Sequence, residues 1–327
     1  MVSIRQVAQM AGVSPATVSR VINGTAKVDE EKAQRVWKVI RETGFTPNEI
    51  ARSLYKKSSK IIGLITPNIE NPFFNQVAKE IEEKAYEHGY RLTLCSTNDN
   101  DEKEKANIQM LTRMNADGMI LMTNNEEIRG ELETCNMPVV VLDRQLRGSG
   151  MSYIQADHYQ GGRMATEHLI QCGCKNIVNV KGPQAFSSAR ARFKGYQDVC
   201  QEHRLVQQCV ECDYNYHAGL RAAKEILEQY PDTDGVIACN DMVAISIYKV
   251  FHKAGIAIPN QVQLIGFDNI DESYLMTPEL TTIAQPVKQI GEKAMELIIA
   301  GINQVGGRQE YTFPVKLIQR ETTIPMK

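Results

Sequence analysis

The chain has 327 residues, 43% of them hydrophobic and 23% charged, which is enough for two or three globular domains. Its formal net charge of −2 conceals an asymmetry, because residues 1–60 hold eleven Lys and Arg against five Asp and Glu, a balance of +6, and the remainder carries −8. No apolar run is long enough to span a bilayer, which excludes a membrane-spanning chain, and the charge distribution predicts a basic head that contacts phosphates and an acidic body that does not.

The residues from Ile4 to Asn23 predict two short helices joined by a tight turn. Ser3 can cap the first helix in a capping box, and Gly12 can end it in the left-handed conformation. Ser14 can cap the second helix, with Pro15 at its first position. The second helix leaves these side chains outward: Pro15, Ala16, Thr17, Ser19 and Arg20. This layout indicates a helix-turn-helix whose second helix enters a DNA major groove, although an isolated match would favour an ordinary helical corner.

A third helix is predicted from Asp29, which can cap it, to Gly44, which can end it. Its apolar stripe contains Trp37, and we expect this only tryptophan of the chain to lie in the small core of the head. Fewer than 50 residues bury little apolar area, so the head should be only marginally stable by itself.

The next segment, residues 48–57, predicts a short basic helix that is too short to persist alone in water. Leu54 lies between basic residues, where a leucine can act as a wedge between base steps in the minor groove. A plain linker helix with Leu54 packed on a neighbouring domain is an equal alternative from these residues alone.

Three motifs together carry a family resemblance: AxxAGVSxxTVSRVIN, then GFxPNxxARSL, then a strand that begins an α/β body. They resemble the LacI/GalR family of bacterial repressors, and the likeness covers the whole chain. The resemblance implies that the second helix reads the major groove, that residues 48–59 are a hinge helix and linker, and that Leu54 opens the central base step of a palindromic operator. By matching position it implies these DNA contacts: Ser3, Ser14, Pro15, Ala16, Thr17, Arg20, Asn23, Arg52 and Leu54.

These residues differ in what they can recognise. Arg20 is the side chain best able to make a bidentate contact to guanine, whereas Pro15 and Ala16 offer only apolar groups that suit thymine methyls or shape. The expected phosphate contacts, which set register and not sequence, are Ser3, Ser14, Asn23, Thr25 and Arg52.

From Ile61 on, short apolar runs alternate with amphipathic helical segments, which predicts two parallel α/β units in tandem. The predicted fold is a small all-α helix-turn-helix head followed by an α/β sensor, similar to periplasmic binding proteins, with two doubly wound parallel-sheet lobes. The last strand, YTFPVKLIQR, is expected to return to the first lobe. The expected boundaries are a head at 1–47, a hinge and linker at 48–59, a first lobe at 60–158 and 289–319, and a second lobe at 159–288 and 320–327.

Polar, charged and aromatic side chains follow several of the predicted strands. Ligands bind beyond the carboxyl ends of parallel strands, and two facing lobes would place those ends at a cleft. Carboxylates accept hydrogen bonds from sugar hydroxyls, arginine forks donate to them, and aromatic rings stack on sugar rings. Each residue also has an ordinary structural interpretation, as a local ion pair, a helix cap or a core side chain.

The set resembles that of bacterial ribose-binding proteins and of ribose operon repressors in the same superfamily, through NPFF, LDR, ND, GFD and IAQP. The resemblance implies ribose contacts from these residues: Asn71, Phe73, Phe74, Asp143, Arg144, Arg192, Tyr214, Asn240, Asp268 and Gln285. Pro67 departs from the small hydroxyl residue expected at its position and removes one potential hydrogen bond to the sugar.

The sequence predicts no cofactor and no metal. No GxGxxG motif follows the first strand, and Cys209 with Cys212 is a lone CxxC pair without a second pair of ligands. The eight cysteines are scattered, and no secretory signal is recognisable, so we expect free thiols in the reducing cytoplasm.

The resulting prediction is a homodimeric transcription repressor that binds a pseudo-palindromic operator and is controlled by a sugar, ribose by resemblance. The resemblance implies induction by the sugar, since the residues alone do not determine the sign of the coupling. The alternatives are another sugar or a purine as effector, a phosphoprotein corepressor, a sugar-binding transport protein and a sugar-processing enzyme. No nucleophile motif or phosphate loop supports the enzyme, so no catalytic residue is expected.

Overall fold

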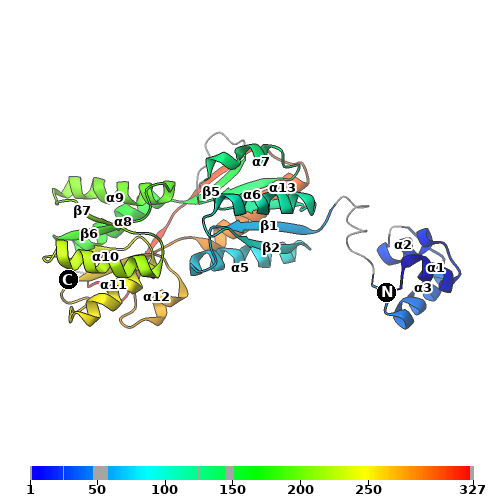
Figure 1. Cartoon of the computed structure of the whole chain (residues 1–327), viewed down its shortest axis with the longest axis horizontal. Helices are drawn as coiled ribbons and strands as arrows, with labels where there is room; N and C mark the ends of the chain where they lie inside the picture. The colour runs from blue at the N-terminus through cyan, green and yellow to red at the C-terminus, as the bar shows by residue number, and fades with distance from the viewer. Residues whose placement is uncertain (1, 25, 47–57, 124, 144–150, 325–327) are drawn as a thin grey trace. The chain divides into compact units, whose positions relative to one another are not determined.

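The computed structural model describes residues 2–24, 26–46, 58–123, 125–143 and 151–324. The chain divides into two compact units, the head at residues 1–59 and the body at residues 60–327, and each is considered by itself (Figure 1). Within the described residues, no helix is long and apolar enough to cross a membrane.

The head contains the three predicted helices, which are α1 (Ile4–Ala11), α2 (Pro15–Asn23) and α3 (Glu30–Thr43). The predicted caps are confirmed. Ser3 and Gln6 form the capping box of α1, and Gly12 ends that helix with a φ of 64°. The Ser14 side chain accepts from the Thr17 backbone N–H at the start of α2. Local capping therefore defines both helices and the turn between them.

The core of the head is made by one apolar stripe from each helix. It comprises Val7, Ala8, Ala11, Val18, Val36 and Val39. The prediction that Trp37 lies in this core is wrong, because 41% of its side chain is exposed. Val36 and Val39 lie one turn apart and share the inner face of α3, whereas Trp37 follows Val36 by about 100° and points outward.

The first lobe of the body is a parallel sheet in the order β11-β5-β4-β3-β1-β2. Its strands are β1 (Ile61–Thr66), β2 (Arg91–Ser96), β3 (Gly118–Leu121), β4 (Val139–Leu142), β5 (Ser152–Ala156) and β11 (Glu310–Phe313). Its helical segments are α5 (Pro72–Glu87), α6 (Asp101–Arg113), η1 (Glu126–Ile128), α7 (Arg129–Glu133) and α13 (Val287–Ile302).

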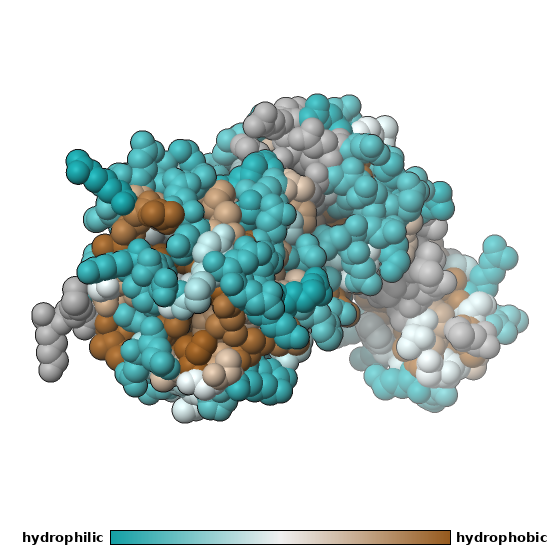
Figure 2. Space-filling view, turned by 60° about the vertical axis from the view of Figure 1, so that its left-hand side comes forward, coloured by the Kyte–Doolittle hydropathy of each residue, from teal (hydrophilic) through white to brown (hydrophobic). Residues whose placement is uncertain are grey.

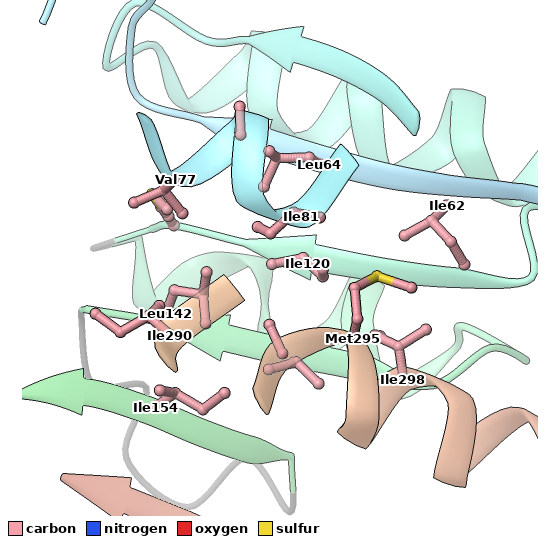
Figure 3. Close-up of a cluster of buried hydrophobic side chains, with 14 of the residues drawn as sticks. Ile62, Leu64, Val77, Ile81, Ile120, Leu142, Ile154, Ile290, Met295 and Ile298 are labelled. Atoms are coloured by element: carbon pink, nitrogen blue, oxygen red, sulfur yellow. The ribbon is translucent and has the colours of Figure 1, made fainter. Parts of the chain in front are cut away.

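Both faces of this sheet are covered by helices. Side chains of α5 and α13, including Val77, Ile81 and Ile290, pack against one face of the strands (Figure 3). Ile108 and Leu111 of α6, with Leu132 of α7, cover the other face. Burial on both faces explains why the strands read as continuous apolar runs.

The second lobe repeats this plan with a sheet in the order β12-β10-β9-β8-β6-β7. Its strands are β6 (Ile177–Lys181), β7 (Gln208–Glu211), β8 (Gly235–Ile237), β9 (Gln263–Asp268), β10 (Thr281–Ala284) and β12 (Lys316–Ile318). Its helices are α8 (His158–Gln171), α9 (Ser187–His203), α10 (Tyr216–Gln229), α11 (Asp241–Lys253) and α12 (Asp271–Leu275). The space-filling view shows a mainly hydrophilic surface interrupted by hydrophobic areas (Figure 2).

The expected last strand is in fact two strands in different lobes, which corrects the predicted boundary at residue 319. β11 pairs with β5 in the first sheet, but β12 pairs antiparallel with β10 in the second. The sequence Pro314-Val315 separates them, because proline cannot donate to a ladder and marks the point where the chain changes sheets. The chain returns to the first lobe at Val287, where α13 begins, two residues before the expected boundary at residue 289.

Candidate functional site

The head presents a small exposed surface on α2. Pro15, Ala16 and Arg20 are exposed, as predicted for the face that would meet base edges. Thr17 is half-buried, and its hydroxyl lies 2.9 Å from the Ser14 hydroxyl. The Ser3 hydroxyl is similarly engaged, since it donates to Gln6 Oε1 at 3.0 Å. The serine hydroxyls therefore already cap helices, and the exposed backbone N–H groups at those helix starts remain the better candidates for phosphate contacts.

Asn23 is tied to its own helix. Its Nδ2 donates to the backbone carbonyl of Ser19 at 2.8 Å, and its buried Oδ1 has no partner. An acceptor oxygen cannot bind a phosphate directly, and Nδ2 also donates to Ser19 Oγ at 3.3 Å, so the expected phosphate contact would require Nδ2 to give up one of its partners on Ser19. The expected DNA contacts from Thr25, Arg52 and Leu54 lie outside the described residues, as does the sugar contact from Arg144.

In the body, three of the predicted strand-end residues lie in the first lobe at the start of α5. They are Asn71, Phe73 and Phe74. Asn71 is 8% exposed, and its Oδ1 caps the helix by accepting from the Phe73 backbone N–H at 3.0 Å. The two phenylalanine rings meet edge to face, with centroids 5.5 Å apart, and pack in a cluster with Ile270 of the second lobe. They therefore lie where the two lobes meet, as side chains packed in the core.

Arg192 of α9 contacts three residues at the ends of β8 and β9 in the second lobe. Its Nη1 donates to the backbone carbonyl of Cys239 at 2.7 Å, and its guanidinium lies 3.6 Å from the centre of the Phe267 ring. Its Nη2 lies 3.6 Å from Asp268 Oδ1. The side chain is 12% exposed, so its charge is desolvated and needs these partners.

Asp268 ends β9 in an uncommon backbone conformation, with a φ of 111°. Such strain costs about 1–3 kcal/mol and persists only where surrounding structure enforces it. Its Oδ1 accepts from Gln285 Nε2 at 2.7 Å. Burial raises the pKa of Asp268 to about 7, against the opposing effects of Arg192 and of the Gln285 hydrogen bond. This carboxyl is therefore near its ionisation point at neutral pH.

Asp143 follows β4 with a φ of 65°, a second left-handed residue at a strand end. Its Oδ1 lies 2.6 Å from Nε2 of His158, the first residue of α8. His158 Nδ1 in turn accepts from Arg192 Nε at 3.2 Å. His158 thus joins a first-lobe carboxylate to a second-lobe arginine. The sequence interpretation missed His158 because it treated that residue only as the start of a helix, although it follows strand β5 as the other candidates follow theirs.

Three buried polar atoms near these strand ends have no partner. They are Thr66 Oγ1 at the end of β1, Asn240 Nδ2 at the start of α11 and Gln285 Oε1 after β10. Asn240 uses its Oδ1 to cap α11, by accepting from the Val243 backbone N–H at 2.9 Å. Buried polar groups are almost always paired, so unpaired ones at the mouths of both sheets favour a polar ligand. Thr66 is a further candidate that sequence reasoning did not single out.

Tyr214 follows β7 and stacks on Phe186 with ring centroids 5.9 Å apart. Phe186 also borders a hollow of about 330 Å³ whose first-lobe wall includes Pro67, Thr97 and Thr123. A second hollow, of about 580 Å³, is bordered by Asp268 and Gln285. Both hollows have walls from the two lobes. Asp268 and Gln285 bring a carboxylate and an amide to the larger one, whereas Arg192 and Tyr214 border a separate small pocket of about 20 Å³.

Within the described residues, no group of three or more His, Cys, Asp or Glu side chains has the geometry of a metal site. The eight cysteines are free, and burial raises the pKa of the Cys95, Cys172, Cys174 and Cys200 thiols. High thiol pKa values make nucleophilic or redox chemistry at these positions unfavourable.

Two family models match the chain. The family described as bacterial regulatory proteins, lacI family, matches residues 3–48. The family described as periplasmic binding proteins and sugar binding domain of the LacI family matches residues 59–321, which is more than half of the chain.

Two curated relatives match over nearly the whole length. A ribose operon repressor of Halalkalibacterium halodurans is 37% identical over 99% of this chain and 97% of its own length. A ribose operon repressor of Bacillus subtilis is 36% identical over 99% of both chains.

Solved structures match as well. A periplasmic binding protein/LacI transcriptional regulator from Alkaliphilus metalliredigens, complexed with D-xylulofuranose, is 37% identical with a TM-score of 0.74 over 81% of this chain and 99% of its own. A LacI family regulator from Enterococcus faecium with bound ribose is 28% identical with a TM-score of 0.75 over 82% and 100%. A lac repressor dimer bound to operator shares the fold, at 24% identity and a TM-score of 0.89 over 99% of both chains.

Proposed function

This chain belongs to the LacI family of bacterial regulatory proteins, and we propose that it is a transcriptional repressor whose affinity for its operator is controlled by D-ribose bound between the two lobes of its body. The family consists of regulators and not enzymes, so no catalytic residue is assigned. The observation that carries the sugar part is the buried set Arg192, Asp268 and Gln285, together with the unpaired polar atoms around it.

A sugar suits this set because it offers both donors and acceptors on one ring. The Asp268 carboxylate accepts from hydroxyls, the Arg192 fork donates to them, and the free Asn240 Nδ2 and Gln285 Oε1 supply one donor and one acceptor. Phe73, Phe74 and Tyr214 supply aromatic surface for the apolar face of the ring. The two relatives named as ribose operon repressors and the neighbour with bound ribose support ribose among the pentoses.

D-xylulose is the second candidate. The neighbour complexed with D-xylulofuranose shares 37% identity with this chain, against 28% for the neighbour with bound ribose. Both sugars are pentoses with several hydroxyl groups, and the same carboxylate and guanidinium groups could bind either one. Discrimination would depend on the hydroxyl pattern that the buried amides contact.

The DNA part of the proposal assigns base contacts to Pro15, Ala16, Thr17 and Arg20 of α2. These few contacts form a weak code, so we propose that the chain acts as a homodimer on a pseudo-palindromic operator, which doubles the number of contacts. The neighbouring lac repressor is itself a dimer on its operator. A DNA partner places the protein in the bacterial cytoplasm.

The coupling that we propose is induction. Sugar binding draws the two lobes together, and the altered geometry of the body disfavours the paired arrangement of residues 48–59 on DNA. The sugar can shift this equilibrium only by its difference in affinity for the two states. Operator DNA must then weaken sugar binding by the same factor by which the sugar weakens operator binding.

The test uses the full-length chain. An operator is first selected from random DNA duplexes, and then D-ribose, D-xylulose, D-glucose and adenine are titrated by calorimetry and in an operator-release assay. D-Ribose should bind and release the operator. Tighter binding and release by D-xylulose would select the second candidate, and binding of neither pentose would refute the proposed function.

A further inference from the structure

His158 lies at the first position of α8, where the chain passes from the first sheet into the second lobe, and it is 2% exposed. We propose that His158 is a positioning residue for sugar binding, which in its neutral form with the proton on Nε2 holds Asp143 and Arg192 in the orientations that they present to the sugar. This inference rests on the proposed function, because both partners are proposed sugar contacts.

The tautomer follows from the two hydrogen bonds. Arg192 Nε can only donate, so His158 Nδ1, at 3.2 Å, must be the acceptor and carries no hydrogen. The proton of a neutral imidazole then resides on Nε2, which points at Asp143 Oδ1 at 2.6 Å. The ring therefore has one donor and one acceptor, each with a partner of the opposite kind.

The charges around the ring favour this neutral state. Asp143, Asp157 and Arg192 are the charged groups that act on it, and burial lowers the pKa of His158 against the attraction of the two carboxylates. A second proton on Nδ1 would face the N–H of Arg192, so donor would meet donor and cation would meet cation. The ring also lies against Phe267, with centroids 5.9 Å apart, and is 2% exposed, so bulk solvent screens these charges little.

His158 completes the constraint on the guanidinium of Arg192. Nη1 is held by the Cys239 carbonyl and the flat face lies on Phe267, while His158 holds Nε. With two nitrogens and one face fixed, the plane of the fork is defined, and Nη2 points toward Asp268. Without the histidine, the guanidinium could rotate about its remaining contacts. Sugar binding would then have to order it again, and this entropic cost would weaken the affinity.

The backbone supports the same arrangement. α8 and α9 approach so closely that a Cβ added at Gly162 would lie 2.0 Å from the Arg192 carbonyl oxygen, and one added at Gly195 would lie 2.3 Å from the Tyr159 carbonyl oxygen. These two glycines allow the helices to touch, which sets the distance between His158 and Arg192. Asp143, by contrast, comes from the first sheet, so His158 is also a hydrogen-bonded link between the lobes.

The test separates the two bonds with three variants of the full-length chain. His158→Asn can keep an acceptor near the position of Nδ1, His158→Gln can keep a donor near the position of Nε2, and His158→Leu keeps neither. We expect the ribose Kd to rise about 10- to 100-fold in His158→Leu, and by less in the other two, because a hydrogen bond to a charged group is worth about 1.5–3 kcal/mol.

His168 provides a matched control on the same helix. It is also a buried histidine, and it bonds Thr323 at 2.8 Å away from the proposed site. His168→Leu should lower the melting temperature and leave the ribose Kd unchanged. ¹⁵N spectra of ring-labelled histidine give a further readout, in which the resonances missing from His158→Asn should show an unprotonated Nδ1 and a protonated Nε2.

Each outcome decides the matter. Partial rescue by Asn or Gln, with the expected tautomer, supports a positioning role. Wild-type affinity in His158→Leu, or equal losses of affinity in all three variants that follow their losses of melting temperature, would overturn it. If the wild-type protein binds no pentose at all, the proposed function fails first and this inference fails with it.

Discussion

Replacement of Asp268 by asparagine should make the protein more stable and a poorer sugar binder. Burial raises the pKa of this carboxyl to about 7, whereas an aspartate in an unfolded chain titrates near 3.9. The folded state therefore binds the proton more tightly than the unfolded state. The unfolding free energy contributed by this group falls as the pH rises from about 4 to about 7, and the loss is complete above pH 7.

The magnitude follows from the difference in pKa. A difference of about three corresponds to about 4 kcal/mol, and this net figure already includes the attraction of Arg192 and the Gln285 hydrogen bond. Asparagine resembles the protonated carboxyl and can still accept from Gln285 Nε2. Asp268→Asn should raise the unfolding free energy by up to about 4 kcal/mol at pH 8 but only by about 1 to 2 kcal/mol at pH 5.

The same change should weaken ribose binding. One lost hydrogen bond from a sugar hydroxyl to a carboxylate is worth about 1.5–3 kcal/mol, which is about 10- to 100-fold in Kd. Operator binding without sugar should be unchanged. Urea unfolding at pH 5 and pH 8 and calorimetric titration with ribose measure the two effects.

Asp232→Asn is the control, because Asp232 is exposed and the same charge is removed. It should change neither the stability nor the affinity. The reasoning on burial is refuted if Asp268→Asn is less stable than wild type at pH 8 or shows the wild-type pH dependence. The sugar contact is refuted if the variant binds ribose with wild-type affinity.

Three further outcomes are expected. Leu54→Ala should weaken binding to the selected operator and leave ribose binding nearly intact, and equal operator affinity in a salt-matched titration would contradict the wedge. Arg20→Ala should cost about 1–3 kcal/mol of operator affinity and relax the preference at one base pair, which binding to a panel of single-base operator variants would reveal. Gly162→Ala should lower the unfolding free energy by about 1–3 kcal/mol or more and weaken ribose binding, because its Cβ would lie 2.0 Å from the Arg192 carbonyl oxygen. Gly130→Ala, with nothing within 4 Å of the added Cβ in helix α7, should leave ribose binding unchanged and should not lower the unfolding free energy.

Much of the local structure could be predicted from the sequence. The caps at Ser3, Ser14 and Asp29 and the ends at Gly12 and Gly44 are where the patterns placed them, because capping depends on residues three or four positions apart. The failure at Trp37 has the opposite cause. The apolar residues of one helix do not show where its buried face ends. The positions of the neighbouring helices decide this, and they leave Trp37 exposed beside the buried Val36.

The sequence predicted most of the residues of the candidate site, but not how they contact one another. The ends of parallel strands are identifiable from apolar runs, so Asp143, Asp268 and Gln285 could be named without coordinates. The sequence interpretation missed His158, because its importance lies in contacts with residues 15 and 34 positions away. The split of the last strand between sheets also escaped it, because the strand with which a short segment pairs is set by tertiary contacts and not by the residues of the segment itself.

The sequence by itself determined the three-helix head, the two α/β lobes and the family, because these depend on local periodicity, caps and motifs that can be recognised in the amino-acid sequence alone. Only the tertiary structure decided that Asp143, His158, Arg192, Asp268 and Gln285 form one series across the body, joined by three hydrogen bonds and by the ion pair between Arg192 and Asp268. It also showed which of their polar atoms are already satisfied. The physical reason is that burial and pairing, which determine the pKa of Asp268 and the tautomer of His158, arise between segments that are far apart in the chain.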